Sequence, residues 1–420
     1  MTAPRRASFL VRPLDTAWLR DGKPFTAGEA SDDPGLFPPT PWTWQGMIRT
    51  RMLIGKYGKG LAARSQAQIA AEIGSPGRLP SGWRFWGPFP AQRGGGLADE
   101  GGIAQPWVPV PSFVALQPQA ETSGGGWQIA GRSFSFEGLQ GGALSSSTPK
   151  LCRHLMGQRH GYKGSDKGWM RVDNLVFALL GRGRWDPQGV SAGEKRAQGG
   201  ADLPPFVYEE RRPGVAIGEN GRAADSMLYF ATHHRFVDGS GLWGAVEGAP
   251  AELGGQLCKG SAALGRKERL IGLEAAEPSA EFSALLAGSA ALAAPWDADL
   301  HVRVVLLSPS PQLTSMPFAL PEGATLMGAE RRAGPDLGGF DRYGAAAGRP
   351  SRAMFGAGSS FWVHLPAANN EVDRAKAVRH LLGLEPDLRT DDESLGFGQR
   401  VGAPFDPCTG EPATGGPHGS

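Results

Sequence analysis

The stretch that decides the fold prediction is "LFPPTPWTWQGMIRTRMLIGKYG", residues 36–58. Thr40 is a residue type that caps helix N-termini, and Pro41 suits the first helical position. Four large apolar residues recur at helical spacing and share one face. They are Trp44, Met47, Ile48 and Met52. The pattern predicts a helix that begins at Pro41, with Arg49 and Arg51 off the apolar face and free to reach a partner.

The stretch before this helix is "RPLDTAWLRDGKPF", residues 12–25. Residues 8–14, "SFLVRPL", are apolar and β-prone, so they predict a strand that leads into this stretch. Asp21-Gly22 is a turn signal, because Asp tolerates and Gly favours the left-handed conformation. Taken alone, the stretch is typical of a solvated hairpin tip.

The rest of the chain alternates strand-like and helix-like segments. Strands are expected at "WRFWGPFPA", "QPWVPVPSFVAL", "VYEERRPGVAI", "SMLYFATHHRFV", "HVRVVLLSPS" and "MFGAGSSFWVHL". Helices are expected at "VDNLVFALLG", "SAEFSALLAGSAALAA" and "NNEVDRAKAVRHLLG", the last capped by Asn370. Each half of the chain reads strand–helix–strand–strand–helix–strand, which is the order of a ferredoxin-like unit.

The predicted fold class is therefore α+β, with two ferredoxin-like (RRM-like) domains, antiparallel sheets, glycine-rich loops and loop insertions. We expect an N-terminal domain over residues 1–220, with a basic insertion near 120–170. A C-terminal domain with glycine loops is expected over 221–402, followed by a disordered tail at 403–420.

Composition excludes several classes of protein. Of the 420 residues 40% are hydrophobic, with 12 Trp and 19 Phe, which excludes a disordered chain. The apolar runs are too short to span a bilayer, and no signal-peptide pattern opens the chain. The three cysteines, Cys152, Cys258 and Cys408, are isolated, which indicates a reducing compartment and no zinc site. We expect a cytoplasmic protein with no membrane partner.

Charge is unevenly distributed along the chain. The net charge is only +2, yet residues 150–184 hold eight Lys or Arg and two Asp. One basic segment on a nearly neutral protein is typical of a local polyanion site.

Catalytic motifs are missing from the sequence. It contains no Walker loop, G-x-S-x-G elbow or H-E-x-x-H motif. Adjacent His233 and His234 are expected to point one inward and one outward on a strand, so they should not chelate one metal. We expect no cofactor, no metal site and no enzyme.

The motifs together resemble a known family. R-P-L-D…R-D-G-K-P-F followed by F-P-P-T-P…G-M-I-R-T is similar to the third subunit of the Cmr complex, a RAMP-superfamily component of type III-B CRISPR effectors. Further similarities follow in the family's order: "WGPF", "WVPVP", "GWMRVDNLVFALLG", "EERRPGVAI", "MLYFATHHRF", "GGFD", "GRPSRAMFGAGSSFWVHL" and "LGFGQRV". The segment "LGRKER" departs from the family's L-G-G-E-x-R, because Arg266 replaces the second glycine.

The resemblance implies an RNA-binding subunit that does not cut RNA. It would hold the repeat-derived 5′ tag of the crRNA. Its neighbours would be the large polymerase-like subunit and the backbone RAMP subunits of the same complex.

Single-stranded RNA held in a fixed shape needs cations for phosphates and backbone N–H groups that approach closely. Glycine loops permit that approach, and their N–H groups can point at phosphates. The expected RNA-binding residues are Arg20, Lys23, Arg49, Arg51, Lys150, Arg153, His154, Arg159, His160, Lys163, Arg211, Gly338, Gly339, Arg349, Gly356, Gly358, Gly396 and Gly398.

Two other functions remain open from the sequence. One is a RAMP endoribonuclease that processes precursor crRNA, although such enzymes work through a positioned His and no histidine precedes His154. The other is a mainly protein-binding scaffold subunit of a related type III complex.

Overall fold

The largest sheet has eight strands in the order β13-β14-β1-β12-β4-β5-β8-β9, and adjacent strands run antiparallel. Its central strand β1 buries Phe9, Leu10 and Val11, so both faces of the sheet are covered. The strands are β1 (Arg6–Pro13), β4 (Arg84–Arg93), β5 (Ala104–Pro109), β8 (Trp169–Arg171), β9 (Val190–Ser191), β12 (Ser240–Glu247), β13 (Lys259–Leu264) and β14 (Arg269–Ala275).

The computed structural model describes fourteen parts of the chain, which are residues 6–20, 32–33, 35–75, 77–94, 103–119, 125–132, 168–191, 203–217, 222–312, 316–335, 337–340, 348–385, 390–407 and 411–413. Within them, no helix combines the length and apolar character needed to cross a membrane.

One face of the large sheet packs against α1 (Pro41–Tyr57) and α4 (Ala251–Gly255). The Thr40 side chain accepts a hydrogen bond from the Thr43 N–H at 3.2 Å, so the predicted helix start is confirmed. The predicted apolar face is also confirmed: its four residues are buried, and the Trp44 ring stacks on Phe9 of β1 at 5.7 Å. A short helix α2 (Gln66–Ile73) follows α1.

The opposite face packs against α3 (Val172–Leu180) and α5 (Ala280–Leu286). This core includes Trp243 of β12 together with Trp362 and Val401 from the C-terminal part of the chain. Both ends of the chain therefore contribute to a single hydrophobic core. α3 ends at Gly181 in the left-handed conformation, as its sequence predicts.

A second antiparallel sheet has the strand order β17-β21-β15-β22. The helices α6 and α7 cover the face that carries Val302 and Val304. The predicted cap of α7 is confirmed, because the Asn370 side chain accepts the Asp373 N–H at 2.9 Å. The elements are β15 (Leu300–Leu306), β17 (Thr325–Glu330), β21 (Ser360–Leu365), β22 (Arg400–Pro404), α6 (Ser289–Leu292) and α7 (Glu371–Leu381).

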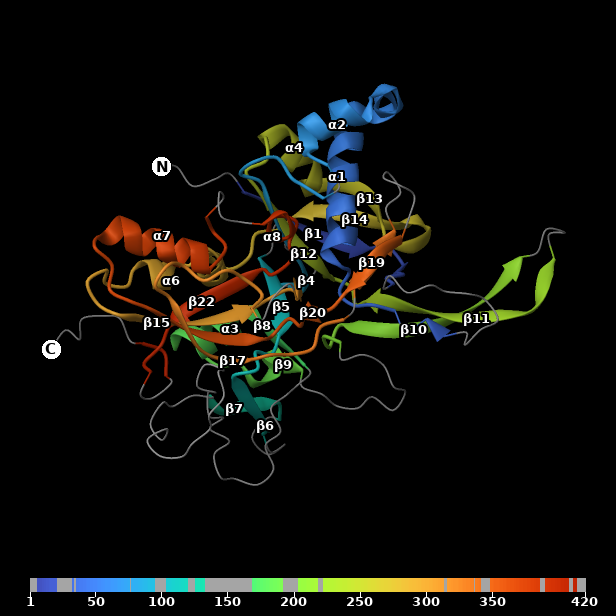
Figure 1. Ribbon diagram of the computed structural model, residues 1–420. Coiled ribbons are helices and arrows are strands. Elements are labelled where there is room, and N and C mark those ends of the chain that lie inside the picture. Colours follow the sequence, from blue (N-terminus) through green and yellow to red (C-terminus); the bar gives the residue numbers. More distant parts are fainter. Residues whose placement is uncertain are drawn as a thin grey trace.

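A long hairpin, β10 (Val207–Ile217) and β11 (Ala223–Phe236), projects away from the body of the molecule (Figure 1). We call it the hairpin arm. It joins the body where β11 pairs with β2 (Thr16–Ala17) and β3 (Asp32–Asp33). β10 is the outer strand of this sheet, and it carries Pro213 in its middle.

The described residues also form smaller elements. They are the strand pairs β6 (Val114–Pro118) with β7 (Trp127–Arg132), β16 (Ser310–Pro311) with β20 (Met354–Phe355), and β18 (Leu337–Phe340) with β19 (Gly348–Arg352), and the helix α8 (Asp391–Ser394). The mixed α/β composition with several antiparallel sheets agrees with the predicted α+β class.

Two local predictions were wrong. Gly338 and Gly339 lie in strand β18 rather than in a turn. His233 and His234 are both buried, instead of one inward and one outward. The ring of His233 stacks on Trp18 at 5.2 Å, and that of His234 lies 5.1 Å from Phe37, so the base of the hairpin arm is covered on both faces.

Candidate functional site

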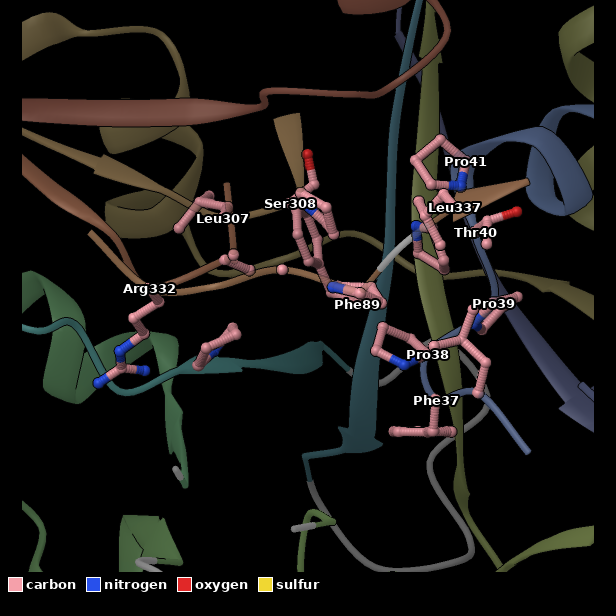
Figure 2. Close-up of a pocket in the computed structure, with 18 of the residues that line it drawn as sticks. Phe37, Pro38, Pro39, Thr40, Pro41, Phe89, Leu307, Ser308, Arg332 and Leu337 are labelled. Atoms are coloured by element: carbon pink, nitrogen blue, oxygen red, sulfur yellow. The ribbon is translucent and has the colours of Figure 1, made fainter. Parts of the chain in front are cut away.

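A pocket of about 520 Å³ opens where the large sheet meets the C-terminal part of the chain (Figure 2). In Figure 2 the segment Phe37–Pro41 and the side chain of Arg332 lie on opposite sides of this pocket. The walls come from residues 36–41, 88–89, 168–169, 307–309, 332–335 and 356–357, with Pro109 and Leu337. Segments more than 300 residues apart in the sequence therefore share one cavity.

The pocket lining is apolar and rigid. It contains seven prolines together with Phe37, Phe89 and Trp169, and the Phe37 ring meets that of Trp169 edge-on at 6.1 Å. Arg332 is the one charged residue among the described residues of the lining. Rigid apolar walls with one guanidinium suit a flat ring that carries an anionic group, such as a nucleotide base and its phosphate.

The side chain of Gln399 joins two walls of the pocket. Its Oε1 accepts the N–H of Gly87 at 2.9 Å, and its Nε2 donates to the carbonyls of Gly87 and Gly396, both at 2.7 Å. Ser308 supports the same turn, because its Oγ donates to the Gly396 carbonyl at 2.8 Å and accepts the Gln399 N–H at 2.9 Å. Since Gln399 is fully buried, we call this set of bonds the Gln399 latch.

Glycine is required at position 87, where the latch engages. Gly87 has φ = +86°, and a Cβ there would lie 2.5 Å from the Trp243 carbonyl oxygen. A side chain would therefore be strained by its backbone conformation and by the neighbouring strand. The next residues, Pro88 and Phe89, line the pocket.

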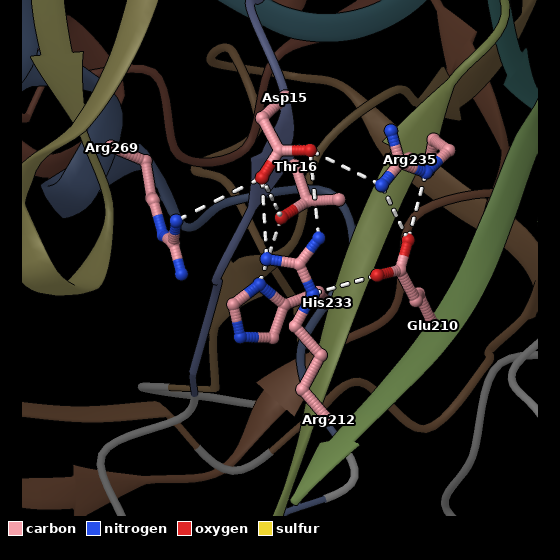
Figure 3. A network of polar contacts seen from close by, with 7 residues as sticks. All are labelled: Asp15, Thr16, Glu210, Arg212, His233, Arg235 and Arg269. Atoms are coloured by element: carbon pink, nitrogen blue, oxygen red, sulfur yellow. Dashed lines mark hydrogen bonds and ion pairs between the residues drawn. The ribbon is translucent and has the colours of Figure 1, made fainter. Parts of the chain in front are cut away.

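A network of charged side chains lies at the base of the hairpin arm (Figure 3). The carboxylate of Asp15 pairs with Arg212 at 3.2 Å, with Arg235 at 3.1 Å and with Arg269 at 3.9 Å. Glu210 pairs with both Arg212 and Arg235 at 2.7 Å. The hydrogen bonds and charges of the arginines outweigh desolvation and hold the pKa values of Asp15 and Glu210 below their usual range.

The histidines beside this network stay neutral at physiological pH. Burial, reinforced by the charges of Arg212 and Arg269, lowers the pKa of His233 to about 4. Burial also lowers the pKa of His234 to about 4, with His233 adding to the effect. His233 Nδ1 lies 2.9 Å from Thr16 Oγ1, so the pair forms a hydrogen bond. Within the described residues, no three His, Cys, Asp or Glu side chains gather as a metal site requires.

A model of the family "CRISPR-associated protein (Cas_Cmr3)" matches residues 9–401. The chain belongs to the Cas_Cmr3 family. This membership agrees with the sequence resemblance to the third subunit of the Cmr complex. A search of curated proteins gives no match.

Two solved structures resemble this Cas_Cmr3 protein. One is a chain of the type III-B Cmr-beta complex bound to cognate target RNA and AMPPnP, with 12% identity and a TM-score of 0.43, covering 96% of this chain and 98% of that one. The other is a chain of Cmr-beta bound to cognate target RNA, with 12% identity and a TM-score of 0.38, covering 96% and 97%.

Arg49 of this Cas_Cmr3 chain is not free to reach a partner, so that expectation was wrong. Its guanidinium is buried and donates to the carbonyls of Gly74 and Ser75 and to Gln45 Oε1. Burial lowers its pKa to about 10. The group ties α1 to the end of α2. Its spacing of four residues from the buried Leu53 was a sequence signal for an inward position.

Arg51 is also engaged by the protein. It donates to the carbonyls of Gln256 and Lys259, both at 2.9 Å, and so holds α1 against β13. Arg20 is half-buried after β2. Gly338, Gly339 and Arg349 belong to the β18–β19 pair.

The glycine amides do not point at a ligand, so this part of the prediction was also wrong. The N–H groups of Gly356, Gly358, Gly396 and Gly398 are all donated within the protein. Their acceptors are the carbonyls of Arg332, Leu306, Glu393 and Pro309, at 2.8, 2.7, 3.2 and 2.8 Å respectively. These turns hold the walls of the pocket together instead of exposing donors.

Arg211 is the one predicted cation that the structure places on the exposed surface of the hairpin arm. Its guanidinium lies 4.9 Å from the centre of the Phe230 ring. The remaining predicted residues lie outside the described residues, and they are Lys23, Lys150, Arg153, His154, Arg159, His160 and Lys163. The turn at Asp21-Gly22 lies outside them too.

Other arginines that sequence reasoning missed are buried in the body. They are Arg84, Arg303, Arg374 and Arg400. Arg84 lies over the Trp86 ring at 3.7 Å, and Arg303 lies over Phe113 at 4.3 Å. These four arginines therefore pack inside the fold and are not available to bind RNA at the surface.

Proposed function

We propose that this Cas_Cmr3 protein is a non-catalytic RNA-binding subunit that holds the 5′ tag of the crRNA. It would also join the large polymerase-like subunit to the RAMP backbone of the complex. The observation that carries the proposal is the apolar pocket between the two sheets, which has one guanidinium at its wall. Family membership supports the same assignment.

The pocket fits the end of a single strand better than a duplex. Its volume of about 520 Å³ is in the range of small-ligand sites, so it can accept one or two nucleotides but not a helix. Bases bind by stacking on aromatic and apolar planes, which Phe37 and Trp169 can supply. Arg332 is positioned to meet a phosphate on the opposite side.

The hairpin arm offers a second RNA contact. Arg211, Pro213 and Val215 alternate with inward residues along β10, and they pair with Thr232, Phe230 and Leu228 of β11. This face carries exposed Val215 and Leu228 beside the Arg211–Phe230 pair. Apolar and guanidinium planes on a projecting arm suit contact with unstacked bases.

The strand orders support two ferredoxin-like units. Along the chain, the four strands of the first unit are β1, β4, β12 and β14. In the sheet order β14-β1-β12-β4, the fourth strand lies beside the first, and the third lies between the first and the second, as a βαββαβ unit requires. The order β22-β15-β21-β17 repeats this arrangement, although the described residues 307–312 and 316–324 form no helix between β15 and β17. Because β12 and β14 pair with β1, we place the boundary between the units after Ala275 instead of at residue 220.

The basic segment near residue 150 provides the first test. We expect the joint substitution of Lys150, Arg153, Arg159 and Lys163 by Ala to weaken binding of a tag RNA about tenfold to a hundredfold near 0.1 M salt. The slope of log K against log salt should become shallower by about 3, since each lost contact to a single strand contributes about 0.7. Fluorescence anisotropy with labelled tag RNA measures both quantities.

The matched control removes four cations from elsewhere on the surface: Arg78, Lys259, Lys376 and Arg379, each changed to Ala. This variant should bind within about twofold of the wild type, because it keeps the local site. Equal loss in both variants would mean that overall charge alone drives binding. Unchanged affinity in the first variant would favour the protein-binding scaffold.

The arm contact has its own test. Arg211→Ala should weaken tag binding about threefold to tenfold, because a cation and its stacked plane are lost together. Arg222→Ala is the matched comparison, because Arg222 is an exposed arginine that directly precedes β11. If both substitutions have the same effect, the Arg211–Phe230 pair has no specific role.

The endoribonuclease alternative is tested by incubating the purified protein with labelled repeat RNA. We expect no cleavage. Site-specific cleavage that copurifies with the protein through successive columns would contradict the non-catalytic assignment.

A further inference from the structure

We infer that Asp15 is a positioning residue that fixes the angle of the hairpin arm relative to the large sheet. Only the RNA contact of the arm rests on the function proposed above. The geometry of Asp15 stands independently of that role.

Asp15 lies between β1 and β2, at the point where the body of the protein meets the arm. On the arm side, its two carboxylate oxygens receive Arg212 of β10 and Arg235 of β11. On the body side, its Oδ2 lies 3.9 Å from Arg269, the first residue of β14. One carboxylate therefore connects three strands that belong to two different sheets (Figure 3).

Glu210 orients the two arginines of the arm that bind Asp15. Its carboxylate receives the Nε atoms of Arg212 at 2.7 Å and Arg235 at 2.8 Å, so both guanidiniums are already oriented within the arm. Oriented guanidiniums lose less side-chain entropy when they bind a second carboxylate. Glu210 thus presents the arm as one rigid unit, and Asp15 attaches that unit to the body.

The backbone connection at this point is short. β11 pairs with β2 only at His234 with Ala17 and at Arg235 with Thr16. One further hydrogen bond joins Thr16 to the ring of His233. β11 also pairs with β3, at Phe230 with Asp32 and at Ala231 with Asp33. Two ladders of two residues each constrain rotation of a long hairpin only in part, so the side chains at its base contribute to the angle.

The network is suited to orientation more than to stability. Its carboxylates and guanidiniums are partly exposed, and exposed ion pairs contribute little free energy one by one. Three arginines share two carboxylates, however, so several weak contacts act on one angle. Salt should loosen the arm without unfolding the protein.

The experiment follows the orientation of the arm in the free protein through a distance between the arm and the body. Cys152, Cys258 and Cys408 are replaced by Ser, and spin labels are placed at Val215→Cys on the arm and Ile54→Cys on α1, both exposed positions. Double electron–electron resonance (DEER) spectroscopy gives the distribution of distances between the labels. In Asp15→Asn we expect the width of the distribution to increase about twofold at about 0.1 M salt.

Salt provides the specific signature. Raising salt from about 0.1 M to about 1 M shortens the Debye length from about 10 Å to about 3 Å and should broaden the wild-type distribution. The Asp15→Asn distribution should not change further. Arg269→Gln keeps the contacts of the arm with Glu210 and should broaden the distribution in the same way.

The control is Glu277→Gln, which breaks a partly exposed ion pair with Arg6 away from the arm. It should keep the wild-type width, and all variants should keep the wild-type melting temperature within a few degrees. A narrow, wild-type distribution in Asp15→Asn overturns the inference. A broadened distribution with unchanged affinity for tag RNA supports the role of Asp15 and contradicts the proposed RNA contact of the arm.

Discussion

Replacing Gln399 by Ala is expected to lower the free energy of unfolding by about 3–5 kcal/mol. The substitution removes three hydrogen bonds and leaves the N–H and C=O of Gly87 buried without their partner. Each unsatisfied buried group costs about 1–3 kcal/mol, and the missing side chain leaves a cavity as well. Urea unfolding followed by tryptophan fluorescence measures the loss.

Two further variants separate the causes. Gln399→Met keeps most of the volume but makes no hydrogen bond, so it should retain most of the destabilisation if the latch depends on polar pairing. Gln66→Ala changes an exposed glutamine of α2 and should stay within about 0.5 kcal/mol of the wild type. If Gln399→Ala proved as mild as Gln66→Ala, the latch would contribute nothing to the contact between the pocket walls.

Replacing Glu393 by Ala is expected to lower the free energy of unfolding by a similar amount. Its carboxylate pairs with the fully buried guanidinium of Arg400, which also donates to the Leu381 carbonyl at 2.6 Å and lies over the Phe318 ring at 4.6 Å. Glu393→Ala leaves a positive charge buried beside backbone carbonyls alone. Breaking a buried pair in this way costs about 3–5 kcal/mol, whereas Glu277→Ala at an exposed pair should cost about 0–1 kcal/mol.

The pair also makes stability depend on pH. Burial raises the pKa of Glu393, but the charge of Arg400 and the hydrogen bonds from Thr390 and Arg400 outweigh it and hold that pKa below its usual value. A carboxyl with a lowered folded pKa stabilises the protein fully above its unfolded pKa, and this stabilisation is lost as the pH falls through the folded value. We therefore expect Glu393→Gln to flatten the acid limb of the stability curve. An unchanged acid limb would show that other carboxyls control it.

Local elements were predictable because their signals are local. Thr40 and Pro41 start α1, Gly181 ends α3, and Asn370 caps α7, each through contacts within a few residues. The two strands of the hairpin arm were likewise visible as β-prone segments. Caps and periodicity depend on neighbouring residues, which a sequence displays directly.

The candidate site was less predictable, because its contacts join distant segments. Nothing near Gln399 in the sequence indicates Gly87, and nothing near Asp15 indicates Arg269. The residue type alone did not distinguish structural arginines from exposed ones. Arg49 is buried against backbone carbonyls, whereas Arg211 is exposed on the arm. The glycines were correctly placed in turns at 356–358 and 396–398, but only the folded chain reveals which carbonyls receive their amides.

Pro213 in the outer strand β10 has a consequence for the protein in concentrated solution. A proline has no N–H to offer a neighbouring strand, and within sheets it is tolerated at edges. Without such an interruption, the edge strand of a long projecting hairpin could pair with the same strand of a second molecule and lead to dimers or fibrils. Because Pro213 interrupts the row of edge donors on β10, we expect the projecting arm to resist pairing with the arm of a second molecule.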